Sequence, residues 1–110
     1  MTQTEINTML DQTGLSHTYY SWPEKAAPAL PYLLWYFPSS DNFAADDTVY
    51  KHIETLNLEL YTKTKSFATE AAVEAVLDAW NLVWSREEAY IESEQMYQVF
   101  YQMEVTIDGQ

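Results

Sequence analysis

Cysteine is missing altogether from the 110 residues of this sequence. Without thiols, neither a disulfide framework nor a thiolate metal site can form. The first residues, Met1 to Glu5, also lack the basic segment followed by an apolar segment that marks a secretory signal. Both absences indicate a protein of the reducing cytoplasm.

Glycine is almost as scarce, since Gly14 and Gly109 are the only two in the chain. Loops that cradle phosphates, of the Walker or dinucleotide-binding kind, need several glycines so that the backbone can approach the phosphate closely. The sequence therefore excludes a nucleotide site of either kind.

Positive charge is the third shortage. Five Lys and Arg stand against seventeen Asp and Glu, which gives a formal net charge of -12. A basic footprint for nucleic-acid phosphates is then excluded, and anionic membrane surfaces are repelled. No apolar run approaches the roughly 20 residues that a membrane-spanning helix needs. We expect a soluble protein with neither a specific nucleic acid nor a membrane as partner.

Apolar and aromatic residues, by contrast, are plentiful. Hydrophobic residues make up 47% of the chain and aromatic residues 15%, with nine Tyr and four Trp. This is far too much apolar material for a disordered chain, and the length suffices for one hydrophobic core but not for two. We predict a single domain over residues 1–110.

The first helix is predicted over residues 3–13. Thr2 and Glu5 have the spacing of a capping box, an apolar stripe follows at helical spacing, and Gly14 can end the helix in a left-handed conformation. A strand is expected over residues 17–22, which are rich in strand-favouring types. Prolines then exclude regular structure up to Tyr32.

The middle of the chain is predicted to form two strands and a long loop. The continuous apolar run over residues 32–37 predicts a central strand ended by Pro38. Polar residues over 39–47 predict a loop. Residues 48–62 predict a long strand, in which the change of buried parity indicates a bulge or bend near Glu54.

The last third predicts one helix and two strands. Ser66 can cap a helix whose apolar face repeats at helical spacing until about Asn81. Strands are expected over residues 82–91 and 97–107, the second with almost strict apolar and polar alternation. This order predicts an α+β fold, with a single antiparallel sheet of about four to five strands and two helices packed on one face.

Candidate chemical groups are few. His17 and His52 lie in separate strands with no carboxylate at metal-ligand spacing, whereas zinc needs about four ligands. The aspartates of the 39–47 loop lack the twelve-residue spacing of a calcium loop. The glutamates of residues 87–94 are best interpreted as a solvated acidic face rather than as an acid and base pair. We predict no catalytic, cofactor or metal site, and no enzyme.

Aromatic side chains are more numerous than a core of this size requires, and such residues are enriched at protein interfaces. Coverage of sheet edges and helix seams is the alternative explanation for each residue alone. As a group they favour a protein partner. The candidates for the interface are Tyr19, Trp22, Phe43 and Phe100, with Trp84 as a further one.

Several short stretches, in order, span nearly the whole chain. They are Leu10 to Leu15, Asp41 to Asp46 with Val49 and Tyr50, Asn57 to Thr62, Val73 to Asp78, and Tyr90 to Glu94. None of them is a catalytic signature. Through these stretches the chain resembles a family of small structural proteins encoded among the head and tail genes of long-tailed phages and prophages of Gram-positive bacteria.

The resemblance implies a place at the head-tail junction, as a tail terminator or tail-completion subunit that caps the tail tube as a hexameric ring. The implied partners are further copies of the chain, the tail-tube protein and neck or connector proteins. The implied location is the host cytoplasm during assembly and then the virion. A head-completion or connector role in the neck stays open. The chain departs from the family pattern at Asp46 and Asp47, where Asp-Gly is expected.

Within that setting, the 39–47 loop is hypothesised to project toward the lumen of the ring or toward the adjoining ring. Its carboxylates, Asp41, Asp46 and Asp47, join the interface candidates because an acidic lumen would repel passing DNA rather than bind it.

Two other classes of protein remain as alternatives. An acidic protein of this kind can mimic DNA and inhibit a nuclease or repressor, as an inhibitor encoded by a mobile element. That role needs carboxylates spaced like phosphates along one surface. A small hydrolase would need a pocket with convergent groups of shifted pKa, which the sequence does not indicate.

Overall fold

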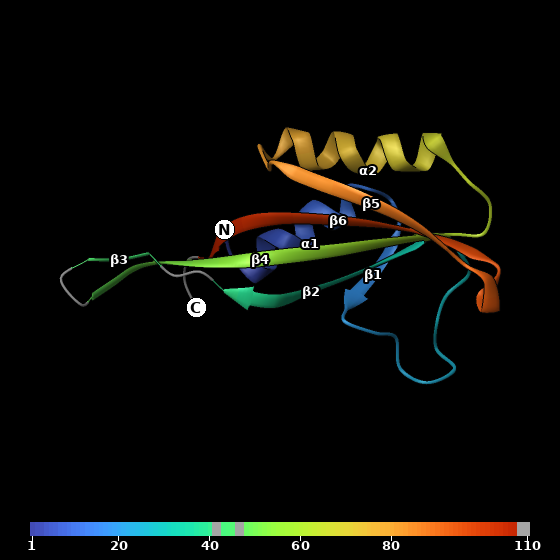
Figure 1. Ribbon diagram of the computed structural model, residues 1–110, viewed down its shortest axis with the longest axis horizontal. Coiled ribbons are helices and arrows are strands. Elements are labelled where there is room, and N and C mark those ends of the chain that lie inside the picture. The colour runs from blue at the N-terminus through green and yellow to red at the C-terminus, as the bar shows by residue number, and fades with distance from the viewer. Residues whose placement is uncertain (41–42, 46–47, 108–110) are drawn as a thin grey trace.

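The computed structural model describes residues 1–40, 43–45 and 48–107, and it confirms the α+β class. Two helices lie against a sheet (Figure 1). Helices and sheet share one hydrophobic cluster. In chain order the elements are α1 (Gln3–Asp11), β1 (Ser16–Tyr19), β2 (Tyr32–Ser40), β3 (Phe43–Ala45), β4 (Thr48–Thr62), α2 (Phe67–Ala79), β5 (Trp84–Ile91), the 3-10 turn η1 (Glu92–Glu94) and β6 (Met96–Ile107).

The strands lie in the order β1-β2-β4-β6-β5, and β3 pairs with β4 outside this path. All neighbours are antiparallel except β1 and β2, which pair in parallel from Ser16 opposite Tyr32 to Tyr19 opposite Trp35. The sheet is therefore mixed, which corrects the expectation of a purely antiparallel sheet. The proline-rich segment over residues 20–31 is long enough to return the chain to the end of the sheet at which β1 began.

Strand β2 continues past Pro38, where the sequence predicted its end. Its pairing with β4 shifts register between Tyr36 and Ser39, so that a bulge accommodates the proline. Strand β1 pairs with β2 only as far as Trp35. Beyond that residue β2 is an edge strand, where a proline removes no hydrogen bond from the ladder.

The predicted bulge near Glu54 is wrong. Strand β4 pairs with β6 without interruption from His52 opposite Ile107 to Thr62 opposite Tyr97. Ile53 lies on the opposite face of the sheet from Leu56 because successive strand residues alternate between faces. The change of parity thus reflects a half-buried isoleucine on the second face rather than a bend.

Both helices pack on one face of the sheet, as predicted. Helix α1 begins with the predicted capping box, in which Glu5 N donates to Thr2 Oγ1 and Thr2 N donates to Glu5 Oε1. It ends at Asp11, two residues before the predicted end. The core residues from the helices and the three longest strands are Ile6, Met9, Leu10, Leu33, Trp35, Leu56, Leu58, Leu60, Val73, Leu77, Val99, Tyr101, Met103, Val105 and Ile107.

The segment predicted as a loop over residues 39–47 contains the end of β2 and all of β3. Strand β3 pairs with residues 48–51 of β4, and this two-stranded extension projects beyond the rest of the sheet (Figure 1). The molecule is accordingly elongated, at 51 × 30 × 23 Å with a radius of gyration of 15.0 Å. A compact chain of this length would have a radius of gyration of about 13 Å.

Candidate functional site: the bare face of the sheet

The sheet face opposite the helices is covered by no helix of the described residues, and we call it the bare face. Tyr20 and Trp22, from the segment after β1, cover only its margin, where their rings contact Tyr36 and Tyr32. Side chains of alternate residues on four strands form its central part: Leu34 of β2; Asn57, Glu59 and Tyr61 of β4; Ser85, Glu87 and Ala89 of β5; and Gln98, Phe100, Gln102 and Glu104 of β6.

Glu59 is held in the middle of this face by tyrosines. Tyr36 Oη donates a hydrogen bond to Glu59 Oε2 at 2.9 Å, and Tyr61 Oη donates to Glu59 Oε1 at 2.7 Å. Gln98 Nε2 in turn donates to Tyr61 Oη at 2.9 Å. Burial raises the pKa of Tyr61, and the hydrogen bond to the Glu59 carboxylate raises it further. The carboxylate therefore has a fixed orientation and tyrosine partners that keep their protons.

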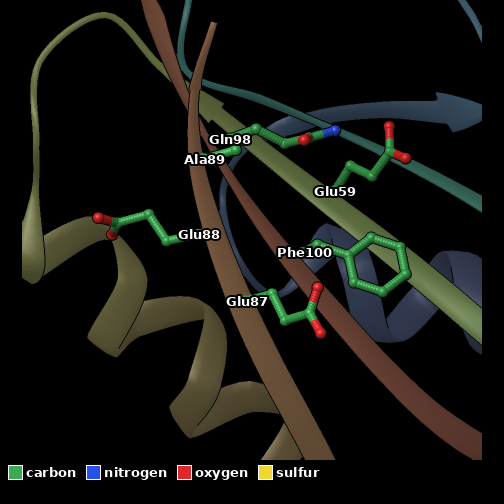
Figure 2. Close-up of a pocket in the computed structure, with 6 residues that line it drawn as sticks. All are labelled: Glu59, Glu87, Glu88, Ala89, Gln98 and Phe100. Carbon is green, nitrogen blue, oxygen red and sulfur yellow. The ribbon is translucent and has the colours of Figure 1, made fainter.

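A hollow of about 300 Å³ lies beside Glu59 on the bare face (Figure 2). Glu59, Phe100 and Glu87 stand directly opposite one another on β4, β6 and β5, so they form one row across the strands. Figure 2 shows the Phe100 ring between the carboxylates of Glu59 and Glu87, with Gln98 above. Glu88 also lines the hollow, but its carboxylate points toward α2. An aromatic ring flanked by two carboxylates is suited to binding a cation.

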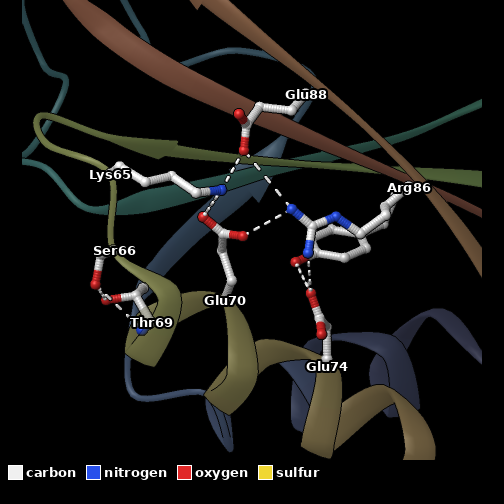
Figure 3. A network of polar contacts seen from close by, with 8 residues as sticks. Lys65, Ser66, Thr69, Glu70, Glu74, Arg86 and Glu88 are labelled. Carbon is white, nitrogen blue, oxygen red and sulfur yellow. Dashed lines mark hydrogen bonds and ion pairs between the residues drawn. The ribbon is translucent and has the colours of Figure 1, made fainter.

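The opposite face carries an ion-pair network between α2 and β5 (Figure 3). The Glu70 side chain, only 2% exposed, lies 2.6 Å from Lys65 Nζ and 2.9 Å from Arg86 Nη2. Arg86 Nη1 reaches Glu74 at 3.2 Å, and Glu88 contacts both cations from the solvent side. Burial alone would lower the pKa of Lys65, but its hydrogen bonds to Glu70 and Glu88 outweigh that effect and raise it. The network fixes α2 on the sheet and occupies the only arginine in the sequence.

Two interface candidates lie at the β1 margin of the sheet. Tyr19 is 49% exposed, and its ring packs edge-on against Trp35 at 4.9 Å between centroids. Trp22 is half-buried against Tyr32, and its indole Nε1 is buried without a hydrogen-bond partner. The structure thus places both at one end of the strand order. Their role in an interface stays a prediction.

The other two described candidates lie on opposite faces. Phe100 is half-buried on the bare face, where it lines the hollow. Trp84 packs against the core residue Tyr101 at 5.5 Å, and its indole nitrogen donates to Asp78 at 2.8 Å. Trp84 therefore contributes to the seam between α2 and β5, which is the alternative explanation given for such residues.

The remaining candidates belong to the 39–47 segment. Asp41, Asp46 and Asp47 lie outside the described residues, and Phe43 is described only as the first residue of β3. The hypothesis that this segment faces a lumen or a second ring remains a prediction.

The histidines of the described residues do not form a metal centre. His17 pairs with Asp11 at 2.7 Å, a carboxylate outside its own strand, and His52 is exposed. No three His, Asp or Glu side chains among residues 1–40, 43–45 and 48–107 gather closely enough to hold a metal ion. Neither described helix has the length and apolar character needed to cross a bilayer.

Glu59, Tyr36 and Tyr61 were not identified from the sequence. The alternation of leucines with Asn57, Glu59 and Tyr61 over residues 56–62 could have placed Glu59 on the polar face of its strand. Its neighbours could not be inferred in this way, because the register with Phe100 and Glu87 depends on pairing between distant segments.

The fold of this chain has a counterpart among solved structures. No protein-family model matches the sequence, and no curated protein matches it. The fold is similar to that of a chain in the "Virion of native gene transfer agent (GTA) particle", with a TM-score of 0.65. The match covers 92% of this chain and 84% of that chain at 17% sequence identity. The likeness shows that the two chains share a fold over nearly their whole lengths.

Proposed function

We propose that this chain is a structural protein of a phage or phage-like virion that acts at the head-tail junction and has no catalytic activity. The observation that carries the proposal is the fold shared over 92% of its length with a virion chain. The sequence resemblance to small head and tail proteins supports the same assignment from independent features. The protein would assemble in the host cytoplasm and remain in the finished particle.

Within that class we propose a tail terminator or tail-completion subunit that forms a ring on the tail tube. A closed ring needs two different patches on each subunit, each meeting the other patch of the next subunit. Strands β1 and β5 lie at the two ends of the strand order, and each has an edge that no described strand covers. Unpaired edges of this kind are ready to pair with another chain.

The projecting β3–β4 extension supports a role in joining rings. It extends well beyond the core, and its pairing with β4 gives it a defined direction (Figure 1). An element of that length can reach a neighbouring subunit or an adjoining ring without unfolding the subunit body. The tail-tube protein on one side and a neck or connector protein on the other are the proposed partners.

Native mass spectrometry over a concentration series tests the proposal, with the protein alone and with the tail-tube protein encoded nearby. We expect a hexamer, or a ring that forms only when the tube protein is present. A monomer that ignores the tube protein at every concentration would contradict the tail terminator role and favour a connector or inhibitor.

A pair of variants makes the same measurement specific to the β1 edge. Tyr19→Lys places a charge at the exposed end of β1, and we expect it to prevent ring assembly. Ala72→Lys adds the same charge on the exposed side of α2 and should assemble normally. Circular dichroism verifies that both variants keep the fold.

A further inference from the structure

The bare face has an uneven charge pattern. Among the residues that β1, β2, β5, β6 and the 52–62 part of β4 direct to this face, the charged ones are Glu59, Glu87 and Glu104, and none is a Lys or Arg. A second bare face brought against this one would place carboxylates against carboxylates, which is repulsive. The face is therefore complementary to a cationic surface.

The shape of the hollow selects among cations. The row of Glu59, Phe100 and Glu87 offers a flat ring with a carboxylate on each side (Figure 2). A guanidinium is planar, stacks on an aromatic ring and donates paired hydrogen bonds in its own plane, whereas an ammonium is a compact point charge. Because two tyrosine hydroxyls already fix the Glu59 carboxylate, little freedom is lost when it accepts a further donor.

The chain itself cannot supply such a group. Arg86 is its only arginine, and that side chain is held against Glu70 and Glu74 on the helix-covered side of the sheet. Releasing it would leave the buried Glu70 carboxylate with one cation fewer. A second copy of this chain therefore has no free guanidinium to offer, and the occupant must come from a different protein.

We propose that the hollow between Glu59, Phe100 and Glu87 binds an arginine side chain presented by a different protein. The ring of Phe100 stacks on the guanidinium, and the two carboxylates accept its N–H groups from either side. The remainder of the bare face, with its amide and tyrosine side chains, contacts the segment that carries the arginine. All residues of this site belong to one chain, so a test of arginine binding is independent of whether the protein forms a ring.

NMR titration of the isotope-labelled protein with the peptide acetyl-Gly-Arg-Gly-amide at millimolar concentrations tests the site. We expect shift changes confined to the amides of Glu59, Glu87, Phe100 and their neighbours. Glu59→Gln keeps an acceptor oxygen for one tyrosine, and its amide N–H can donate to the hydroxyl oxygen of the other. It loses the charge, and it should raise the dissociation constant about tenfold. Phe100→Leu keeps apolar bulk but removes the ring, and it should weaken binding in the same way.

The matched control is Glu104→Gln, which removes the same charge from the same face outside the hollow. It should leave the dissociation constant nearly unchanged, and acetyl-Gly-Lys-Gly-amide should bind more weakly than the arginine peptide. Equal effects of Glu104→Gln and Glu59→Gln would reduce the site to general charge attraction and overturn the proposal. Equal binding of the two peptides, shifts spread over the whole surface, or bare-face shifts that follow protein concentration without peptide would overturn it as well.

Discussion

Glu70 has the most deeply enclosed charge among the described residues, and it shows what one carboxylate contributes to this fold. Its side chain is 2% exposed and contacts both Lys65 and Arg86. A buried charge costs desolvation free energy that only close partners offset, so removal of one partner from such a set leaves the others uncompensated. Glu88 contacts the same two cations, but its side chain is 39% exposed.

Replacing Glu70 by Gln should therefore lower the free energy of unfolding by about 3 kcal/mol. Glu88→Gln, which removes the same charge from the solvent side of the same network, should cost less than about 1 kcal/mol. Urea unfolding followed by circular dichroism measures both values. Similar losses in the two variants would contradict the conclusion that burial of Glu70 decides its effect.

Helix α2 begins with a side-chain cap at Ser66. Ser66 Oγ accepts a hydrogen bond from Thr69 N at 3.2 Å, which satisfies one of the amide groups that a helix leaves unpaired at its N-terminus. The helix supplies Val73 and Leu77 to the core, so a loosened first turn affects the packing of the whole element.

We expect Ser66→Ala to lower the free energy of unfolding by about 1 kcal/mol, whereas Ser66→Asn should retain most of the stability because its side-chain oxygen can accept the same bond. Thermal and urea unfolding of both variants provide the measurement. If the alanine variant matched the natural protein, the cap would have no energetic role.

Signals that depend on neighbouring residues predicted the helices and one strand, whereas the pairing of distant segments could not be predicted. The caps at Thr2 and Ser66 and the alternation over residues 97–107 correctly predicted both helices and β6, because each depends on neighbours in the chain. The direction of β1 was not predictable, since alternation is the same in parallel and antiparallel strands. The predicted end of β2 at Pro38 was wrong because β2 is an edge strand beyond Trp35, where a proline is tolerated.

The candidate site was likewise predictable for a single residue but not for the arrangement of its neighbours. Phe100 was named from the sequence as an interface candidate, and the structure places it on the bare face, where it lines the hollow. Its carboxylate neighbours come from β4 and β5, and their alignment depends on pairings between residues far apart in sequence. A list of aromatic residues could therefore indicate a surface but not its chemistry.

The molecule as a whole should lose stability in alkaline solution through its buried tyrosines. Tyr101 is fully buried and donates to Glu74 at 2.7 Å. Burial raises its pKa above the ordinary value of 10.0, and the bond to the carboxylate adds to the increase. Tyr61 is shifted in the same direction. Because the folded chain keeps these protons when the unfolded chain releases them, their contribution is complete below pH 10 and declines as the pH rises above it.

We therefore expect the free energy of unfolding to be level up to about pH 9 and to fall above about pH 10, by about 1.4 kcal/mol per pH unit for a tyrosine such as Tyr101. Urea unfolding at intervals between pH 8 and pH 11 measures the slope. Tyr101→Phe should start from lower stability and show a flatter decline. A natural protein equally stable at pH 8 and pH 11 would refute the linkage.

The alternation along β4 also has an evolutionary consequence. Leu56, Leu58 and Leu60 build the core, whereas Asn57 and Glu59 between them lie on the bare face. Loss or gain of one codon in this stretch would exchange the two sets, sending leucines to water and a carboxylate into the core. Lineages of this protein should accordingly diverge at Glu59 and its same-face neighbours by substitution, and tolerate insertions and deletions in the connections between strands but not within β4.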